Sequence, residues 1–118
     1  MSGRCFRVLV VEDNPGDYDL ICDWLCQAPI QFESLRATTL AAGRDVFNGN
    51  DDLDVVLLDL DLPDSSGLDT LRGFRELAPH VPIIVVSGTT SLQQRAMAEL
   101  AGAAEMFSKN ECNSRLFS

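Results

Sequence analysis

The stretch Val55–Asp69, VVLLDLDLPDSSGLD, decides the fold. Its apolar start, together with Leu53 and Asp54 before it, predicts a strand over Leu53–Leu58 that is buried on both faces. Asp59 and Asp61 follow this strand, and a loop rich in turn-forming residues comes next. Apolar residues at helical spacing resume after the loop. The stretch therefore predicts a buried strand, a polar loop and a helix in that order.

The same order of strand, polar loop and helix recurs along the rest of the chain. Five such units predict an α/β fold with a parallel sheet and helices on both of its faces. The other predicted strands are Arg7–Val11, Phe32–Ala37, Pro82–Val86 and Ala104–Ser108. The predicted helices begin at Asn14, at Thr39, near Leu68, at one of Ser87, Thr89 and Thr90, and at Asn113, and the last of them is short.

Composition narrows the range of functions. The chain has 118 residues, which is the size of a single domain, and a net charge of −9 from 18 acidic and 9 basic residues. This charge argues against direct nucleic-acid binding, because phosphate backbones are also negative. No apolar run reaches the length of a membrane span, and the start of the chain lacks a signal-peptide pattern. We therefore expect a cytoplasmic protein without membrane contact, built as one domain over residues 1–118.

Polar side chains follow four of the five predicted strands at the point where each strand ends. The carboxyl ends of parallel strands meet at one edge of a sheet, and ligands bind in α/β proteins beyond that edge. We therefore expect these side chains to share one site. They are Glu12 and Asp13 after the first strand, Asp59 and Asp61 after the third, Ser87 after the fourth and Lys109 after the fifth.

These residue types suit phosphoryl transfer with Mg²⁺, which prefers oxygen ligands and keeps several of its waters. Asp13 and Asp59 are candidates for direct ligands, Glu12 for a ligand through water, and Asp61 for a backbone carbonyl ligand. Asp59 can also act as a carboxylate nucleophile and form an aspartyl phosphate. Lys109 and Ser87 can then stabilise the phosphoryl oxygens by charge and by a hydrogen bond.

Four motifs in this order resemble the receiver domain of bacterial response regulators, the chemotaxis-regulator-like switch of two-component systems. The resemblance implies a flavodoxin-like three-layer sandwich whose five-stranded parallel sheet has the order 2-1-3-4-5. It also implies that Asp59 is the phosphoacceptor, Ser87 the switch hydroxyl and Lys109 the active-site lysine, and that Pro63 and Gly67 shape the loop beside the acceptor. The motifs are VVEDN at Val10–Asn14, the stretch quoted above, VVSGT at Val85–Thr89 and FSK at Phe107–Lys109.

Three features depart from the family pattern. Met106 stands where the family usually has a switch aromatic, Asn110 replaces the proline that commonly follows the lysine, and the last helix is too short for a full docking face. We therefore expect a different output route and a chain that forms the N-terminal part of a longer, multidomain protein. Such a protein would carry a downstream effector or kinase domain.

The resemblance also implies partners and excludes ordinary enzyme activity. The partner is a sensor histidine kinase or a phosphotransfer protein, and a second copy of the chain is a further candidate. A receiver supports only its own phosphotransfer and dephosphorylation. Two alternatives stay open: a pseudo-receiver that binds proteins without taking phosphate, and an aspartate-nucleophile phosphatase using Asp59-Leu60-Asp61. The phosphatase is disfavoured because its second acidic pair should follow the nucleophile, whereas here the pair precedes it.

Overall fold

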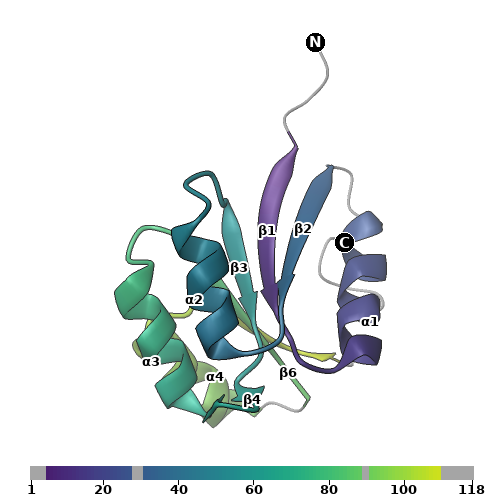
Figure 1. Ribbon diagram of the computed structural model, residues 1–118. Helices are drawn as coiled ribbons and strands as arrows, with labels where there is room; N and C mark the ends of the chain where they lie inside the picture. Colours follow the sequence, from purple (N-terminus) through teal and green to yellow (C-terminus); the bar gives the residue numbers. More distant parts are fainter. Residues whose placement is uncertain (1–4, 28–30, 89–90, 110–118) are drawn as a thin grey trace.

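The computed structural model describes residues 5–27, 31–88 and 91–109. Its elements alternate between strand and helix, as the sequence predicts (Figure 1). The strands are β1 (Phe6–Val11), β2 (Phe32–Ala37), β3 (Val55–Leu58), β4 (Asp61–Leu62), β5 (Ser65–Ser66), β6 (Ile83–Ser87) and β7 (Glu105–Ser108). The helices are α1 (Pro15–Cys26), α2 (Leu40–Asn48), α3 (Leu68–Leu77) and α4 (Leu92–Leu100).

Five of the strands form one parallel sheet with the order β2-β1-β3-β6-β7. This is the predicted order 2-1-3-4-5, because β6 and β7 are the fourth and fifth strands of this sheet. The two-residue strands β4 and β5 form a separate antiparallel pair within the loop that the sequence predicts after β3. The flavodoxin-like fold class is therefore confirmed.

Helices cover both faces of the sheet, as Figure 1 shows with α1 on one side and α2 and α3 on the other. The residues of the two cores alternate along β1, because successive side chains of a strand point to opposite faces. Val8 and Val10 pack with Ile21 and Trp24 of α1, and Leu9 and Val11 belong to the core on the other face. That second core also contains Leu71 and Phe74 of α3 and Ala98 of α4.

Side-chain caps start three of the helices. Asn14 and Thr39 accept backbone N–H hydrogen bonds at the first turns of α1 and α2, as predicted. The prediction for α4 was wrong: its N-cap is Ser91, in a capping box with Gln94. Thr89, Thr90 and the predicted last helix lie outside the described residues.

The methionines Met97 and Met106, which line the same hollow beside α4, differ in their burial. Met106 is buried, but Met97 on α4 is 45% exposed. The reason is that α4 buries only Ala98 among its residues and lies at the margin of the core. Trp24 is buried and His80 is exposed.

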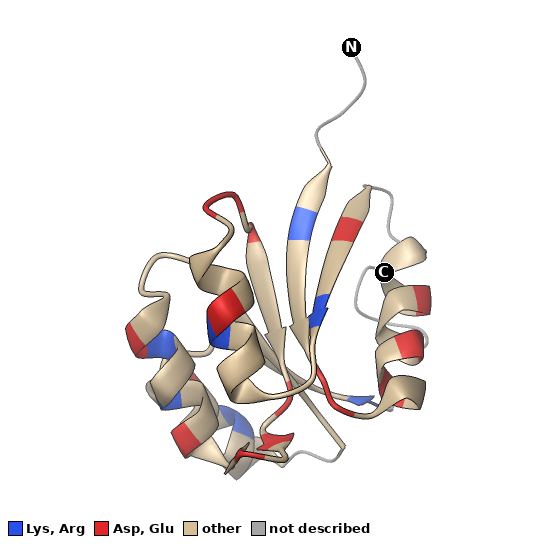
Figure 2. Cartoon of the chain, viewed as in Figure 1, with Lys and Arg blue, Asp and Glu red and all other residues tan. Residues whose placement is uncertain are grey.

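The surface carries acidic residues on several elements, and Figure 2 shows acidic segments following β1 and β3 at the edge of the sheet where the arrowheads lie. This is the edge at which the sequence predicts the site. Within the described ranges, each helix is too short or too polar to cross a membrane.

Candidate functional site

The register of the sheet brings Glu12 and Asp59 side by side. Val11 pairs with Leu58 at the ends of β1 and β3, and each acidic residue comes directly after its strand. The backbone ladder continues one step further, since the Asp59 N–H donates to the Val11 carbonyl at 3.0 Å and the Glu12 N–H donates to the Ala37 carbonyl at 2.9 Å. The backbone of both acidic residues is therefore held in place by hydrogen bonds to the neighbouring strands.

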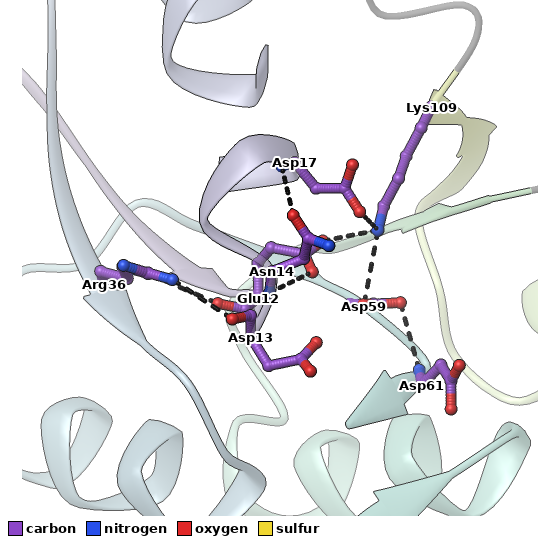
Figure 3. A network of polar contacts seen from close by, with 8 residues as sticks. All are labelled: Glu12, Asp13, Asn14, Asp17, Arg36, Asp59, Asp61 and Lys109. Atoms are coloured by element: carbon purple, nitrogen blue, oxygen red, sulfur yellow. Dashed lines mark hydrogen bonds and ion pairs between the residues drawn. The ribbon is translucent and has the colours of Figure 1, made fainter. Parts of the chain in front are cut away.

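The same logic places Ser87 and Lys109. Ser87 pairs with Ser108 at the ends of β6 and β7, and Lys109 follows directly. Lys109 extends across the sheet edge, with its Nζ 2.8 Å from Glu12 Oε1 and 3.5 Å from Asp59 Oδ2 (Figure 3). A lysine from the last strand thus reaches the acidic residues of the first and third strands.

All six predicted site residues line one open cleft of about 500 Å³. Ser87 and Gly88 form part of its wall, and Asp61 donates its backbone N–H to Asp59 Oδ1 at 3.1 Å. The lining residues are Glu12, Asp13, Asn14, Asp17, Asp59, Asp61, Ser87, Gly88 and Lys109. The convergence that the strand-end pattern predicts is therefore present in the structure.

Burial of charge distinguishes this cleft from ordinary polar surface. The side chains of Glu12, Asp59 and Lys109 are 1%, 6% and 13% exposed. Burial raises the pKa of Glu12 to about 7, and the nearby Asp59 charge adds to this rise while Lys109 opposes it. Burial lowers the pKa of Lys109, but contacts with Asp17 and Glu12 outweigh that effect, so its pKa is raised overall and the amine stays protonated.

Three carboxylates in the cleft have the spacing of a metal site. One oxygen each from Glu12, Asp13 and Asp59 lie within 4.8 Å of one another. Glu12 Oε1 is buried and accepts no hydrogen bond from the described residues, although the charged Lys109 amine is near. Asp13 is exposed and can turn toward an incoming ion. An oxygen-only donor set of this kind fits a hard divalent cation such as Mg²⁺.

Sequence reasoning missed three residues that join elements of the site to one another or to neighbouring elements. Asp17, in the first turn of α1, binds Lys109, and Arg36 of β2 donates to the backbone carbonyls of Glu12 and Asp13 at 3.5 and 3.4 Å. Asp64 accepts the N–H groups of Leu40 and Ala41, which joins the loop after β3 to the start of α2. The available signal for Asp17 was an acid one turn beyond the acidic pair, which is also a common helix-start residue.

Comparison with known proteins assigns this geometry to a family. The family model for the response regulator receiver domain matches residues 8–118. The chain belongs to the response regulator receiver domain family. Receiver domains are signalling modules that bind Mg²⁺ at an acidic pocket, and the cleft of this receiver contains such an acidic group.

Individual relatives agree with this assignment. The transcriptional regulatory protein YrkP of Bacillus subtilis is 33% identical over 115 residues, covering 94% of this chain and 48% of the relative. The cell cycle transcriptional regulator CtrA of Caulobacter vibrioides is 30% identical over 105 residues, covering 87% of this chain and 43% of the relative. The receiver thus spans about half the length of these relatives.

Solved structures agree on the fold. A response regulator receiver domain protein from Clostridium thermocellum superposes with a TM-score of 0.74 at 30% identity, covering 88% of this chain and 82% of the other. The fold of this chain is therefore that of a receiver domain.

Proposed function

We propose that this receiver is a phosphorylation switch of a two-component system, which accepts a phosphoryl group on Asp59 in a Mg²⁺-dependent reaction in the cytoplasm. The donor is a phosphohistidine on a sensor histidine kinase or a phosphotransfer protein. The observation that carries the proposal is the buried Asp59 carboxylate, which shares one cleft with a lysine amine 3.5 Å away and with two further carboxylates.

The residues of the cleft would hold the metal ion in three different ways. Asp13 and Asp59 would bind Mg²⁺ directly, Glu12 would bind it through water, and the backbone carbonyl of Asp61 would supply another oxygen. The bound ion supplies positive charge that offsets the negative charge of the phosphoryl group. The spacing of the carboxylates supports this proposal, because one oxygen each from Glu12, Asp13 and Asp59 lie close enough together to share one ion.

The transfer itself needs positioning and charge more than further chemistry. A carboxylate oxygen of Asp59 attacks phosphorus, the N–P bond of the phosphohistidine breaks, and the imidazole keeps the electron pair. Lys109 stabilises the phosphoryl oxygens by its charge, and the Ser87 hydroxyl donates a hydrogen bond to them. Water later hydrolyses the acyl phosphate and returns Asp59 to its carboxylate form.

The conformational change caused by phosphorylation would pass from the cleft to α4. Ser87 lines the cleft and also a neighbouring apolar hollow of about 290 Å³, which it shares with Met97 of α4 and with Met106. A shift of Ser87 toward the phosphoryl group would change the packing of these methionines and bias the surface of α4. Phe107 is a poorer route, because its ring packs edge-on against Trp24 of α1, at 6.4 Å between centroids.

The decisive experiment treats the protein with acetyl phosphate and Mg²⁺ and measures the intact mass. We expect a gain of one phosphoryl group, no gain with EDTA, and no gain in Asp59→Asn. Asp52→Asn is the matched control, since Asp52 lies in an exposed turn away from the cleft. Absence of any gain in the wild type would favour a pseudo-receiver that binds proteins without phosphate.

The parent protein is part of the proposal as well. We propose that residues 1–118 act as the N-terminal switch of a longer protein with an effector or kinase domain, since the curated relatives extend to about twice this length. A second copy of the chain is a further candidate partner. The family assignment argues against an aspartate-nucleophile phosphatase.

A further inference from the structure

Asp17 contacts the active-site lysine although it belongs to none of the strand ends that build the cleft. It lies in the first turn of α1, and its Oδ2 accepts a hydrogen bond from Lys109 Nζ at 2.7 Å. The two residues are 92 positions apart in the sequence, so the fold alone brings them together. Figure 3 shows the Asp17 carboxylate on one side of the amine and Asp59 on another.

The three acidic contacts of Lys109 are not equivalent. Asp17 accepts a hydrogen bond with suitable distance and angle, whereas Glu12 Oε1, at 2.8 Å, accepts none from the described residues, and Asp59 Oδ2 is 3.5 Å away. The contacts with Glu12 and Asp59 are therefore ion pairs, and the directional contact of the amine is the one with Asp17. A hydrogen bond depends strongly on angle, while charge attraction does not.

This difference matters because a lysine amine is a point charge at the end of a flexible stem. Without a directional partner, the amine can occupy several positions near the acidic residues, and ordering it costs conformational entropy. Asp17 is held by α1, whose start is capped by Asn14 through the Asp17 N–H itself. A carboxylate on such a rigid turn can fix where the amine lies before the phosphoryl group arrives.

We propose that Asp17 is a positioning residue, which holds the Lys109 amine at the cleft so that it faces Asp59 and the phosphoryl group formed there. This inference rests on the proposed phosphorylation of Asp59. Asp17 acts through Lys109, and neither its position nor its chemistry requires it to bind the metal ion. The competing interpretation is that Asp17 only stabilises α1 by its negative charge near the helix N-terminus.

The test compares initial rates of phosphoryl incorporation from acetyl phosphate with saturating Mg²⁺, measured by intact mass. Asp17→Ala and Asp17→Ser remove the carboxylate that reaches the amine, and Asp17→Asn keeps an oxygen that can accept the same hydrogen bond. Asp19→Ala is the matched control, because it removes an exposed acid from the same helix outside the cleft. Circular dichroism establishes that each variant is folded at the assay temperature.

We expect Asp17→Ala and Asp17→Ser to slow phosphorylation by about threefold, the scale of a partly exposed ion pair. Asp17→Asn should recover most of the wild-type rate, and Asp19→Ala should match the wild type. A helix-stabilising role alone would leave the rate of the folded variants unchanged, and that result would overturn the inference. A faster rate in Asp17→Ala, or an Asn variant as slow as Ala, would overturn it as well.

The two proposals fail in different ways. If the wild type and Asp19→Ala take up no phosphoryl group, the proposed function is wrong. If both are phosphorylated and the Asp17 variants keep pace with them, only the positioning role of Asp17 is wrong. The serine variant keeps the test usable if alanine in the first turn unfolds α1.

Discussion

At each end of the central sheet a cationic side chain pairs with acidic side chains, but the acids at the two ends differ in burial. At the amino end, Arg7 of β1 binds Glu33 at 2.8 Å and also binds Asp52. Those two acids are 59% and 65% exposed. At the carboxyl end, Lys109 lies among Glu12 and Asp59, which are almost fully buried.

The Arg7 cluster is therefore an exposed ion cluster, and the Lys109 cluster is a buried one. Exposed ion pairs are close to neutral in their effect on stability, so the Arg7 cluster can join β1, β2 and the turn before β3 at little cost. Burying charge is unfavourable unless each charge is well paired, and three carboxylates around one amine leave an excess of negative charge. Such a cluster destabilises the metal-free fold, and a bound cation would relieve it.

The largest expected effect on stability comes from removing each cation in turn. In EDTA at pH 7, Lys109→Gln should lower the free energy of unfolding by about 2 kcal/mol, because buried Glu12 and Asp59 lose their charge partner. Arg7→Gln should cost less than about 1 kcal/mol, since water replaces its contacts. Urea unfolding measures both values. Equal losses would mean that burial does not distinguish the two clusters.

The pH dependence of stability should reveal the buried Glu12. Its pKa is raised to about 7 in the folded chain, from a usual value of 4.5, so the folded state binds this proton more tightly than the unfolded state. Between these two values, rising pH therefore lowers the free energy of unfolding through this group.

Urea titrations in EDTA across pH 4.5 to 7 should show this loss in the wild type and a smaller loss in Glu12→Gln. The difference between the two proteins isolates Glu12 from other acids. Equal losses in the wild type and in Glu12→Gln would contradict the raised pKa of Glu12. Glu33→Gln, at the amino end of the sheet, should lose as much stability with rising pH as the wild type does.

Mg²⁺ should stabilise the folded chain by binding at the carboxyl end of the sheet and not at the amino end. At a concentration ten times the dissociation constant, a ligand specific for the folded state adds about 1.4 kcal/mol. We expect thermal unfolding with Mg²⁺ to show this gain in the wild type and in Asp52→Asn, and to show little of it in Asp13→Asn. A gain retained by Asp13→Asn would place the bound ion elsewhere.

The smallest expected effect concerns exposed Asp64, whose pKa is lowered by the backbone N–H groups of Leu40 and Ala41. A lowered pKa stabilises the fold above the usual value of 3.8 and loses this contribution as pH falls through the folded-state value. Asp64→Ala should therefore lower the thermal midpoint slightly at neutral pH and make no difference in strong acid. Asp51→Ala, in an exposed turn, should leave the midpoint unchanged at both pH values.

Much of the site was predictable because it follows from short-range order and one topological rule. Glu12, Asp59, Ser87 and Lys109 stand at strand ends, and the apolar runs that precede them are visible in the sequence. Parallel strands then bring such ends to one edge. The caps at Asn14 and Thr39 were also predictable, since a cap bonds within the next few residues.

Side-chain contacts between distant elements could not be predicted in this way. Ser91 starts α4 rather than either threonine before it, and Met97 is partly exposed because α4 lies at the margin of the core. Asp64 bonds to a helix 23 and 24 residues away, which no local pattern in the loop indicates.

By itself, the sequence determined the order of the strands and helices, the edge of the sheet that bears the acidic and basic residues, and the family. Periodicity and turn chemistry act over a few residues, so they can be read directly from the chain. Only the tertiary structure decided that Asp17 accepts a hydrogen bond from Lys109 and that Glu12 is buried with a raised pKa. The first depends on how α1 and the end of β7 come together, and the second on how β1 lies between its neighbouring strands. A local stretch of sequence does not contain the distances between such remote segments.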